Sequence, residues 1–119
     1  MNTFDLILFY NKVKRIKRNL KIVIKTFNDN YYSLINNMQR LDLLHFTLNN
    51  LNILSDNAYD LQFQISLHND FLSLNYDLVN NSLNHNLLFY VGNKLLKLMI
   101  LLLNMRNMIS SILSSIENE

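Results

Sequence analysis

The residues best suited to chemistry in this 119-residue sequence are cations gathered near its N-terminus. Residues 1–26 hold seven Lys and Arg against one Asp, a local charge of +6, whereas residues 27–93 hold one Arg against six Asp, a local charge of −5. A cation that contacts a phosphate releases condensed counterions, so such a cluster binds nucleic acid electrostatically. The sequence therefore predicts a nucleic-acid-binding surface formed by Lys14, Arg15, Lys17, Arg18, Lys21 and Lys25.

Two other interpretations of this cationic cluster remain open. The cations can form a solvated face, or one that answers the acidic middle of the same chain, and they can equally contact anionic lipid headgroups. Tyr10, Tyr31 and Tyr32 stand at the two ends of the cluster. Because aromatic rings stack on unpaired bases, these tyrosines favour the nucleic-acid interpretation.

The other reactive side chains are too scattered to predict catalysis. The sequence has no Cys, which excludes a disulfide framework, a thiol nucleophile and a Cys-based zinc site. His45, His68 and His85 are far apart and lack carboxylates at ligand spacing. The single glycine, Gly92, cannot make a phosphate-binding loop and is expected to permit a close helix contact. We therefore expect a protein that is not an enzyme and that uses no metal, cofactor or small-molecule substrate.

The cationic cluster must be carried by a helix. Between Thr3 and Phe27, apolar residues recur at alternating intervals of three and four, the spacing of one buried helical face. Most of the cations fall on the opposite side, so the helix would pack with one face and present charge with the other. Thr3 is the predicted N-cap, and Asn28, Asp29 and Asn30 are predicted to end the helix.

A second helix is predicted from Tyr31 to Leu54. Asp29 or Asn30 would cap it, and the short link makes it antiparallel to the first helix. Its stripe of leucines ends at a polar segment, Ser55 to Asn57, which is predicted to break the helix.

A change of period follows this break. Apolar and polar residues alternate strictly over residues 61–67 and again over residues 72–78, with a turn expected between them around residues 68–71. Such alternation is typical of strands, so we predict a β-hairpin with one apolar face that leans on the helices or on a partner. A third helix is the competing interpretation, because Leu61, Ile65 and Leu72 also lie near helical spacing.

The longest periodic segment runs from Asn86 to Glu117 and predicts a C-terminal helix. At about 1.5 Å per residue it is roughly 48 Å long, more than a compact chain with a radius of gyration near 14 Å covers. Lys94 and Lys97 interrupt its apolar stretch, so we favour packing on a partner over a membrane-spanning or interfacial helix. The predicted partner-packing residues are Leu95, Leu98, Leu102, Met105, Ile109 and Ile112.

Together these patterns predict a single domain over residues 1–119. Its class is mainly α (α+β), in the order helix, helix, strand, strand, helix, with the C-terminal helix extending onto a partner. The sequence has one Gly and no Pro but seven Phe and six Tyr, the usage expected of an A+T-rich gene such as those of mitochondria, plastids and some viruses.

These features lead us to expect a non-catalytic structural subunit of a large organellar assembly. The specific expectation is a divergent mitochondrial ribosomal protein that contacts rRNA through its basic helix and also contacts neighbouring protein subunits. The alternative is an accessory subunit of a mitochondrial respiratory or ATP synthase complex, with the C-terminal helix at or in the inner membrane. A third possibility is a small viral helical protein that captures a partner's helix in a groove.

Overall fold

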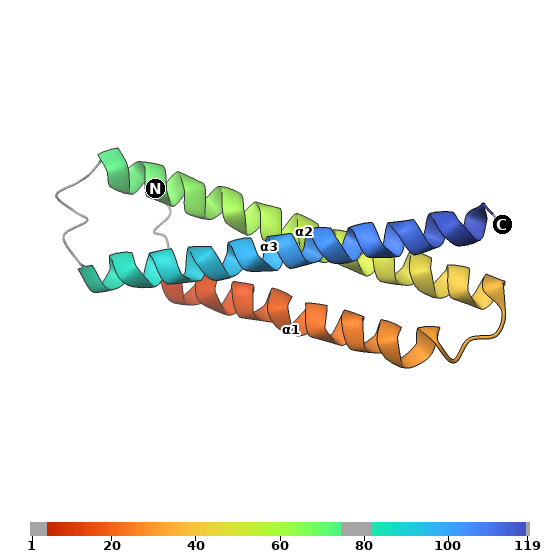
Figure 1. Cartoon of the computed structure of the whole chain (residues 1–119). Coiled ribbons are helices and arrows are strands. Elements are labelled where there is room, and N and C mark those ends of the chain that lie inside the picture. The colour runs from red at the N-terminus through yellow and green to blue at the C-terminus, as the bar shows by residue number, and fades with distance from the viewer. Residues whose placement is uncertain (1–4, 75–81, 119) are drawn as a thin grey trace.

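The chain folds as a bundle of three long helices. The computed structural model describes residues 5–74 and 82–118. The helices α1 and α3 run in the same direction, and α2 runs antiparallel to both (Figure 1). Within the described residues the elements are α1 (Leu6–Tyr31), α2 (Asn37–Leu74) and α3 (Ser82–Glu117). The predicted antiparallel pairing of the first two helices is confirmed.

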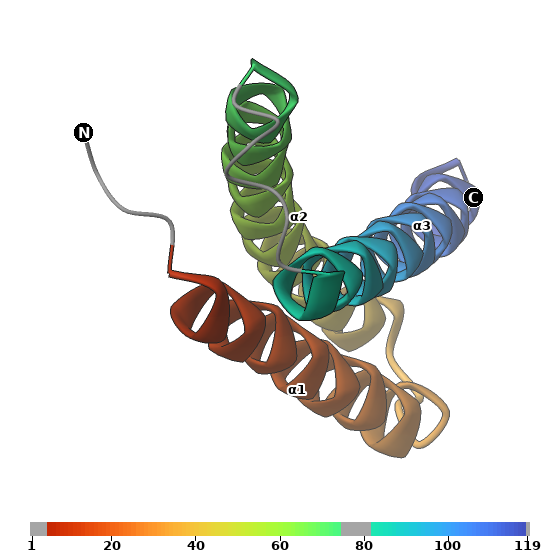
Figure 2. The ribbon, with the colours of Figure 1, turned by 90° about the vertical axis from the view of Figure 1, so that its left-hand side faces the viewer.

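The bundle is a rod rather than a globule. It measures 61 × 23 × 21 Å, and its radius of gyration of 18.4 Å exceeds the roughly 14 Å expected of a compact chain of this length. The helices α2 and α3 hold 38 and 36 residues, so each is roughly 55 Å long and alone accounts for most of the rod. With 26 residues, α1 covers only part of this pair, and the three helices cross at an angle (Figure 2).

An Asp side chain caps the start of α1, and an Asn side chain caps the start of α2. The Asp5 carboxylate accepts a hydrogen bond from the backbone N–H of Leu8 at 3.0 Å. The Asn36 side chain accepts one from the backbone N–H of Met38 at 2.7 Å. The Asn36 cap stands in place of the predicted Asp29 or Asn30 cap of the second helix. The predicted cap of the first helix, Thr3, lies outside the described residues.

The polar run predicted to end the first helix is itself helical. The α1 helix continues through Asn28, Asp29 and Asn30 to Tyr31, so the predicted end was wrong. The side chains of this run bond back onto the preceding turn: the Asn30 amide donates to the carbonyl of Thr26 at 2.6 Å, and Asp29 pairs with a lysine one turn earlier. Such i to i−4 contacts satisfy the polar groups without breaking the helix.

The predicted β-hairpin is wrong over residues 61–74, and the fold class α+β is corrected to all α over the described residues. Helix α2 runs without a break to Leu74. Alternation would place Leu61, Phe63, Ile65 and Leu67 on one face, yet Leu61 and Ile65 are buried whereas Phe63 and Leu67 are 63% and 54% exposed. Burial thus follows the helical interval of four residues, and Phe63 and Leu67 lie on a different face of the helix from Leu61 and Ile65.

The predicted break at Ser55 to Asn57 is also absent from α2. Ser55 is buried, and its hydroxyl accepts a hydrogen bond from the Arg106 guanidinium of α3 at 3.2 Å. The same guanidinium donates to the Asn52 side chain at 2.9 Å. The polar residues therefore bind across the helix pair instead of ending the helix. The end of the second predicted strand, residues 75–79, lies outside the described residues.

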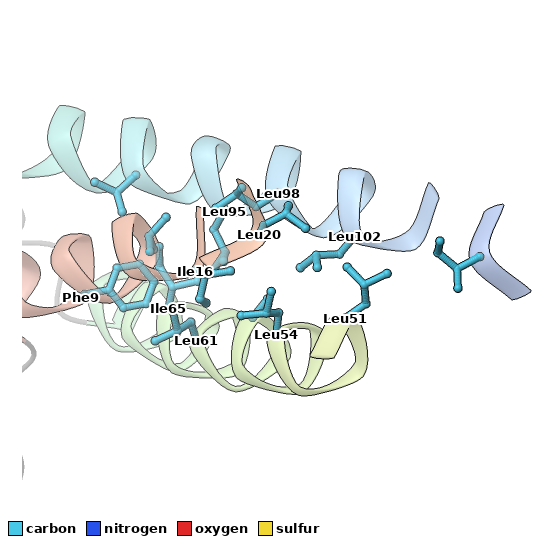
Figure 3. Packing of buried hydrophobic residues seen from close by; sticks show 14 of the residues in the cluster. Phe9, Ile16, Leu20, Leu51, Leu54, Leu61, Ile65, Leu95, Leu98 and Leu102 are labelled. Atoms are coloured by element: carbon cyan, nitrogen blue, oxygen red, sulfur yellow. The ribbon is translucent and has the colours of Figure 1, made fainter. Parts of the chain in front are cut away.

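One apolar core runs along the rod where the helices face each other. Each helix contributes side chains that are almost fully buried, such as Leu20 of α1, Leu51 of α2 and Leu95 of α3 (Figure 3). The predicted C-terminal helix is confirmed, and six of its predicted apolar positions are buried in this core: Leu88, Val91, Leu95, Leu98, Leu102 and Ile109.

Candidate nucleic-acid interface

All six cations predicted to bind nucleic acid lie on the solvent side of α1 and are exposed. The core-facing side of this helix is made by residues such as Phe9, Val13 and Leu20. By helical spacing, five of the six cations form one stripe along the helix, and Arg15 lies apart from them on another side. The stripe consists of Lys14, Lys17, Arg18, Lys21 and Lys25.

This stripe borders α3 at a cluster of tyrosines and lysines. The Tyr10 ring of α1 has the Lys14 ammonium 4.5 Å from its centroid and the Lys94 ammonium of α3 5.9 Å from it. The Lys94 ammonium also lies 4.8 Å from the centroid of the Tyr90 ring. One α3 lysine therefore stands over two aromatic rings, one from each helix, and cation–π attraction favours this placement.

The electrostatic environment of Tyr90 shows that further cations are close. A side-chain hydrogen bond with Lys94 lowers the pKa of Tyr90, and the positive charges of Lys94, Lys17 and Lys97 lower it further. The same hydrogen bond raises the pKa of Lys94, so its ammonium keeps its charge at neutral pH. Lysines from two helices thus act on one exposed site.

We call this surface the cationic flank of α3. Its cations and rings come from both helices: Tyr10, Lys14, Lys17, Lys21, Tyr90, Lys94 and Lys97. Among the described residues, the carboxylates belong to other parts of the molecule: Asp5 caps α1, Asp29 pairs with Lys25 near the end of α1, Glu117 lies near His45, and four aspartates belong to α2. The cationic flank therefore attracts anions such as phosphates, and its rings offer stacking surfaces.

The far end of the stripe carries less net charge. The Lys25 ammonium pairs with the Asp29 carboxylate at 2.7 Å, and both side chains are exposed. The hydrogen bond with Asp29 raises the pKa of Lys25. Because the partner carboxylate cancels much of the field of Lys25, we expect it to contribute less to anion binding than Lys14 or Lys17.

The tyrosines predicted to stack on bases have different surroundings. Tyr10 belongs to the cationic flank. Tyr31 is stacked on Phe27, with ring centroids 4.9 Å apart, and packs against the core. Tyr32 is exposed beyond the end of α1, and its ring meets the edge of Tyr31. Only Tyr10 therefore shares a surface with the clustered cations.

Sequence reasoning missed the contribution of α3 to this surface. Tyr90, Lys94 and Lys97 recur at intervals of four and three, which places them on one side of α3 beside its buried seam. That spacing was visible in the sequence. What it could not reveal is that this side of α3 borders the basic helix, since that depends on how the helices pack.

The residues predicted to pack on a partner lie mostly inside the chain. Leu95, Leu98, Leu102 and Ile109 are buried in the core, and Met105 and Ile112 are half-buried at its edge. That the C-terminal helix contacts a partner stays a prediction. The exposed apolar residues of α3 available for such a contact include Phe89, Leu96, Ile100, Leu101 and Leu103.

Two further features of the described residues concern metal binding and the membrane. No group of three His, Asp or Glu side chains there is arranged to hold a metal ion. The segment Asn86–Glu117 is long and apolar enough to cross a membrane, and 28% of its most apolar window is buried in the bundle.

Comparisons with protein-family models, with curated proteins and with solved structures found no match.

Proposed function

We propose that this protein is a non-catalytic structural subunit that binds RNA phosphates through the cationic flank of α3, most specifically as a divergent mitochondrial ribosomal protein. The observation that carries the proposal is the convergence of lysines from α1 and α3 around Tyr10 and Tyr90. Like charges gathered from two helices repel each other in the free protein, and an RNA backbone would relieve that repulsion.

The two tyrosines extend this proposal from phosphates to bases. Tyr10 and Tyr90 each have a lysine over the ring, so a base stacked on either ring would place its phosphate close to an ammonium. Single-stranded or looped RNA presents such unstacked bases, whereas a regular duplex does not. We therefore expect a preference for looped RNA over duplex RNA of equal length.

Binding of a labelled RNA hairpin by the full chain, measured by fluorescence anisotropy at several salt concentrations, tests the proposal. Lys17→Gln with Lys94→Gln removes one cation from each helix of the cationic flank. We expect affinity to fall about tenfold and the slope of log K against log salt to become shallower by roughly 1.5 to 2, because each lost phosphate contact removes nearly one counterion.

Lys12→Gln with Arg15→Gln is the matched control. It removes the same charge from exposed positions on the other sides of α1. We expect the control to retain most of the affinity and the slope. Equal losses in both double variants would show that only total charge matters, and unchanged binding in the first variant would overturn the proposed interface.

Sedimentation of the native particle tests the proposed assembly. A ribosomal subunit held by phosphate contacts should co-sediment with mitochondrial ribosomes and be released by high salt rather than by detergent. The alternative, a subunit of a respiratory or ATP synthase complex, is favoured by the long apolar segment Asn86–Glu117. In that case the protein should resist salt and carbonate and require detergent for release.

A further inference from the structure

The side of the α2 and α3 pair that faces away from α1 exposes several large apolar side chains. Its residues recur at helical spacing on α3 and are joined by two aromatic residues of α2, and all are between 45% and 69% exposed. We call this surface the apolar flank of α3. It consists of Tyr59, Phe63, Phe89, Leu96, Ile100 and Leu103.

A groove between the two helices lies within the apolar flank. Gln62 and Ile65 of α2 line it together with Phe89, Gly92 and Leu96 of α3. The absence of a side chain at Gly92 keeps the groove open, and a Cβ placed there would lie only 3.3 Å from the Ile65 Cδ1 atom. The floor of the groove is thus set by the backbone of α3.

The groove also contains a polar atom that needs a partner. The Oε1 atom of Gln62 is buried and accepts no hydrogen bond from the described residues. A buried acceptor without a donor costs about 1–3 kcal/mol, so such atoms are few in folded proteins. A donor supplied by a molecule seated in the groove would remove this cost.

The size of the apolar flank is that of a protein interface. A Phe or Tyr side chain has on the order of 200 Å² of surface, so six large side chains at roughly half exposure present on the order of 600 Å². This lies at the upper end of the largest patches on monomeric proteins and near the roughly 800 Å² that each partner buries in a stable complex.

We propose that a second copy of this chain covers the apolar flank, related to the first by a two-fold axis parallel to the helices. This axis places α2 of one copy against α3 of the other. The α2 and α3 helices of the two copies then form a four-helix bundle in which every neighbouring pair is antiparallel. Each apolar flank then buries the other, and side chains of the second copy reach the groove above Gly92.

The charges along the edges of the apolar flank favour this arrangement. Asp60 is exposed one turn before Phe63 on α2, and Lys97 is exposed one turn before Ile100 on α3. Gly92 and Ile65 line the same groove, and a Cβ added at Gly92 would meet the Ile65 side chain, so the two residues lie at about the same level. Lys97 is five residues beyond Gly92, and Asp60 is five residues before Ile65. Because the helices are antiparallel, these two charges lie level.

The positions of Asp60 and Lys97 favour one two-fold axis over the other. A two-fold axis parallel to the helices preserves level, so Asp60 of each copy approaches Lys97 of the other, and opposite charges meet at both edges. An axis across the helices would instead place α2 against α2 and oppose like charges. A lipid bilayer offers neither a cation for Asp60 nor a hydrogen-bond donor for Gln62, so it fits this flank less well.

The proposed dimer leaves most of the cationic flank open to RNA. Because α1 packs on the other side of the helix pair (Figure 2), Tyr10, Tyr90, Lys94 and the lysines of α1 stay on the outside of the dimer. Lys97 is the residue that the two surfaces share, so Ile100→Glu, which leaves the cationic flank unchanged, is the variant that separates dimerisation from RNA binding.

Sedimentation equilibrium of the purified full chain tests the dimer. Ile100→Glu places a charge at the centre of the apolar flank and should weaken dimerisation at least tenfold, because central interface residues carry most of the binding energy. Ile22→Glu is the matched control: Ile22 is 57% exposed and Ile100 is 59% exposed, but Ile22 belongs to α1, on the other side of the helix pair. Circular dichroism verifies that both variants are folded.

A charge exchange tests the symmetry. Asp60→Lys and Lys97→Asp should each weaken the dimer, and the double variant should restore it because opposite charges meet again. A monomeric wild-type chain would overturn the proposal, and so would equal effects of Ile100→Glu and Ile22→Glu. Failure of the double variant to recover would overturn the proposed axis. If a monomeric chain binds phosphatidylcholine vesicles and Ile100→Glu abolishes that binding, the occupant is a membrane.

Discussion

The two flanks of α3 differ in chemistry although they belong to one helix. The cationic flank borders α1 and carries Lys94 and Lys97 beside Tyr90, whereas the apolar flank borders α2 and carries Phe89, Leu96 and Ile100. The residues of the two flanks alternate along the same turns of α3, so the flanks differ mainly in the side of the helix that they occupy. One helix therefore contributes both an uncharged apolar surface and a surface of clustered positive charge.

The chemistry of each flank determines which interactions it can make. Contacts on the cationic flank are long-ranged and weakened by salt, because the lysines remain partly solvated. Contacts on the apolar flank are short-ranged and depend on buried area, so salt affects them little. Salt and point substitutions should therefore separate the two flanks in the same protein.

The largest expected effect comes from a substitution in the core that supports both flanks. Leu95 is fully buried between them, and Leu95→Ala removes three carbon atoms from the core. We expect a loss of about 2–5 kcal/mol in the free energy of unfolding, because a cavity is added to the lost burial. Urea unfolding followed by circular dichroism measures it. Leu96→Ala, at the neighbouring exposed position, should cost less than about 1 kcal/mol, and equal losses would contradict the observed packing.

A smaller effect is expected from the polar contact that joins α2 to α3. The Arg106 guanidinium donates to the Asn52 and Ser55 side chains, and Arg106→Met leaves the buried Ser55 hydroxyl without this donor. We expect a loss of about 1–2 kcal/mol in unfolding free energy, measured as above. Lys12→Met, at an exposed position of α1, is the control and should change stability little. An Arg106→Met protein as stable as wild type would show that water replaces the donor.

Arg106 also illustrates what could be predicted from the sequence. The apolar seams of α1 and α3 were clear from spacing alone, because each has one buried face. The seam of α2 was hidden, because exposed Phe63 and Leu67 add apolar residues to its polar side. Ser55 looked like a helix break because its partner, Arg106, is 51 residues away in the sequence. Local patterns cannot reveal a polar residue that is satisfied by a distant helix.

The candidate site was predictable to a similar extent. The six cations of the first helix were identified from their types and spacing, and all are exposed. Their association with Lys94 and Tyr90 was not predictable, because it follows from which side of α3 packs on α1. The apolar flank was missed for the same reason: exposed and buried apolar residues look alike in a sequence.

A third effect, smaller again, concerns the floor of the groove in the apolar flank. Gly92→Ala reduces the flexibility of the unfolded chain and favours the helix by roughly 1 kcal/mol. The new Cβ would approach the Ile65 Cδ1 atom to 3.3 Å, which the end of that side chain relieves by a slight rotation. We expect a net gain of about 0.5 kcal/mol in urea unfolding and unchanged RNA binding. A loss of stability would show that Ile65 cannot move.

The smallest effect concerns pH, which should change stability without changing RNA binding. Burial lowers the pKa of His68 of α2 from its ordinary value of 6.5, so the unfolded chain binds a proton more readily than the folded protein. Stability should therefore be complete above pH 6.5 and decline as the pH falls below this value. Because His68 is only partly buried, the decline should be slight, and His68→Asn should abolish it. Over the same range Lys94 stays charged, since its pKa is raised, so the cationic flank should bind RNA unchanged in the folded protein. A loss of RNA affinity that precedes unfolding would place a titrating group on the cationic flank and contradict this separation.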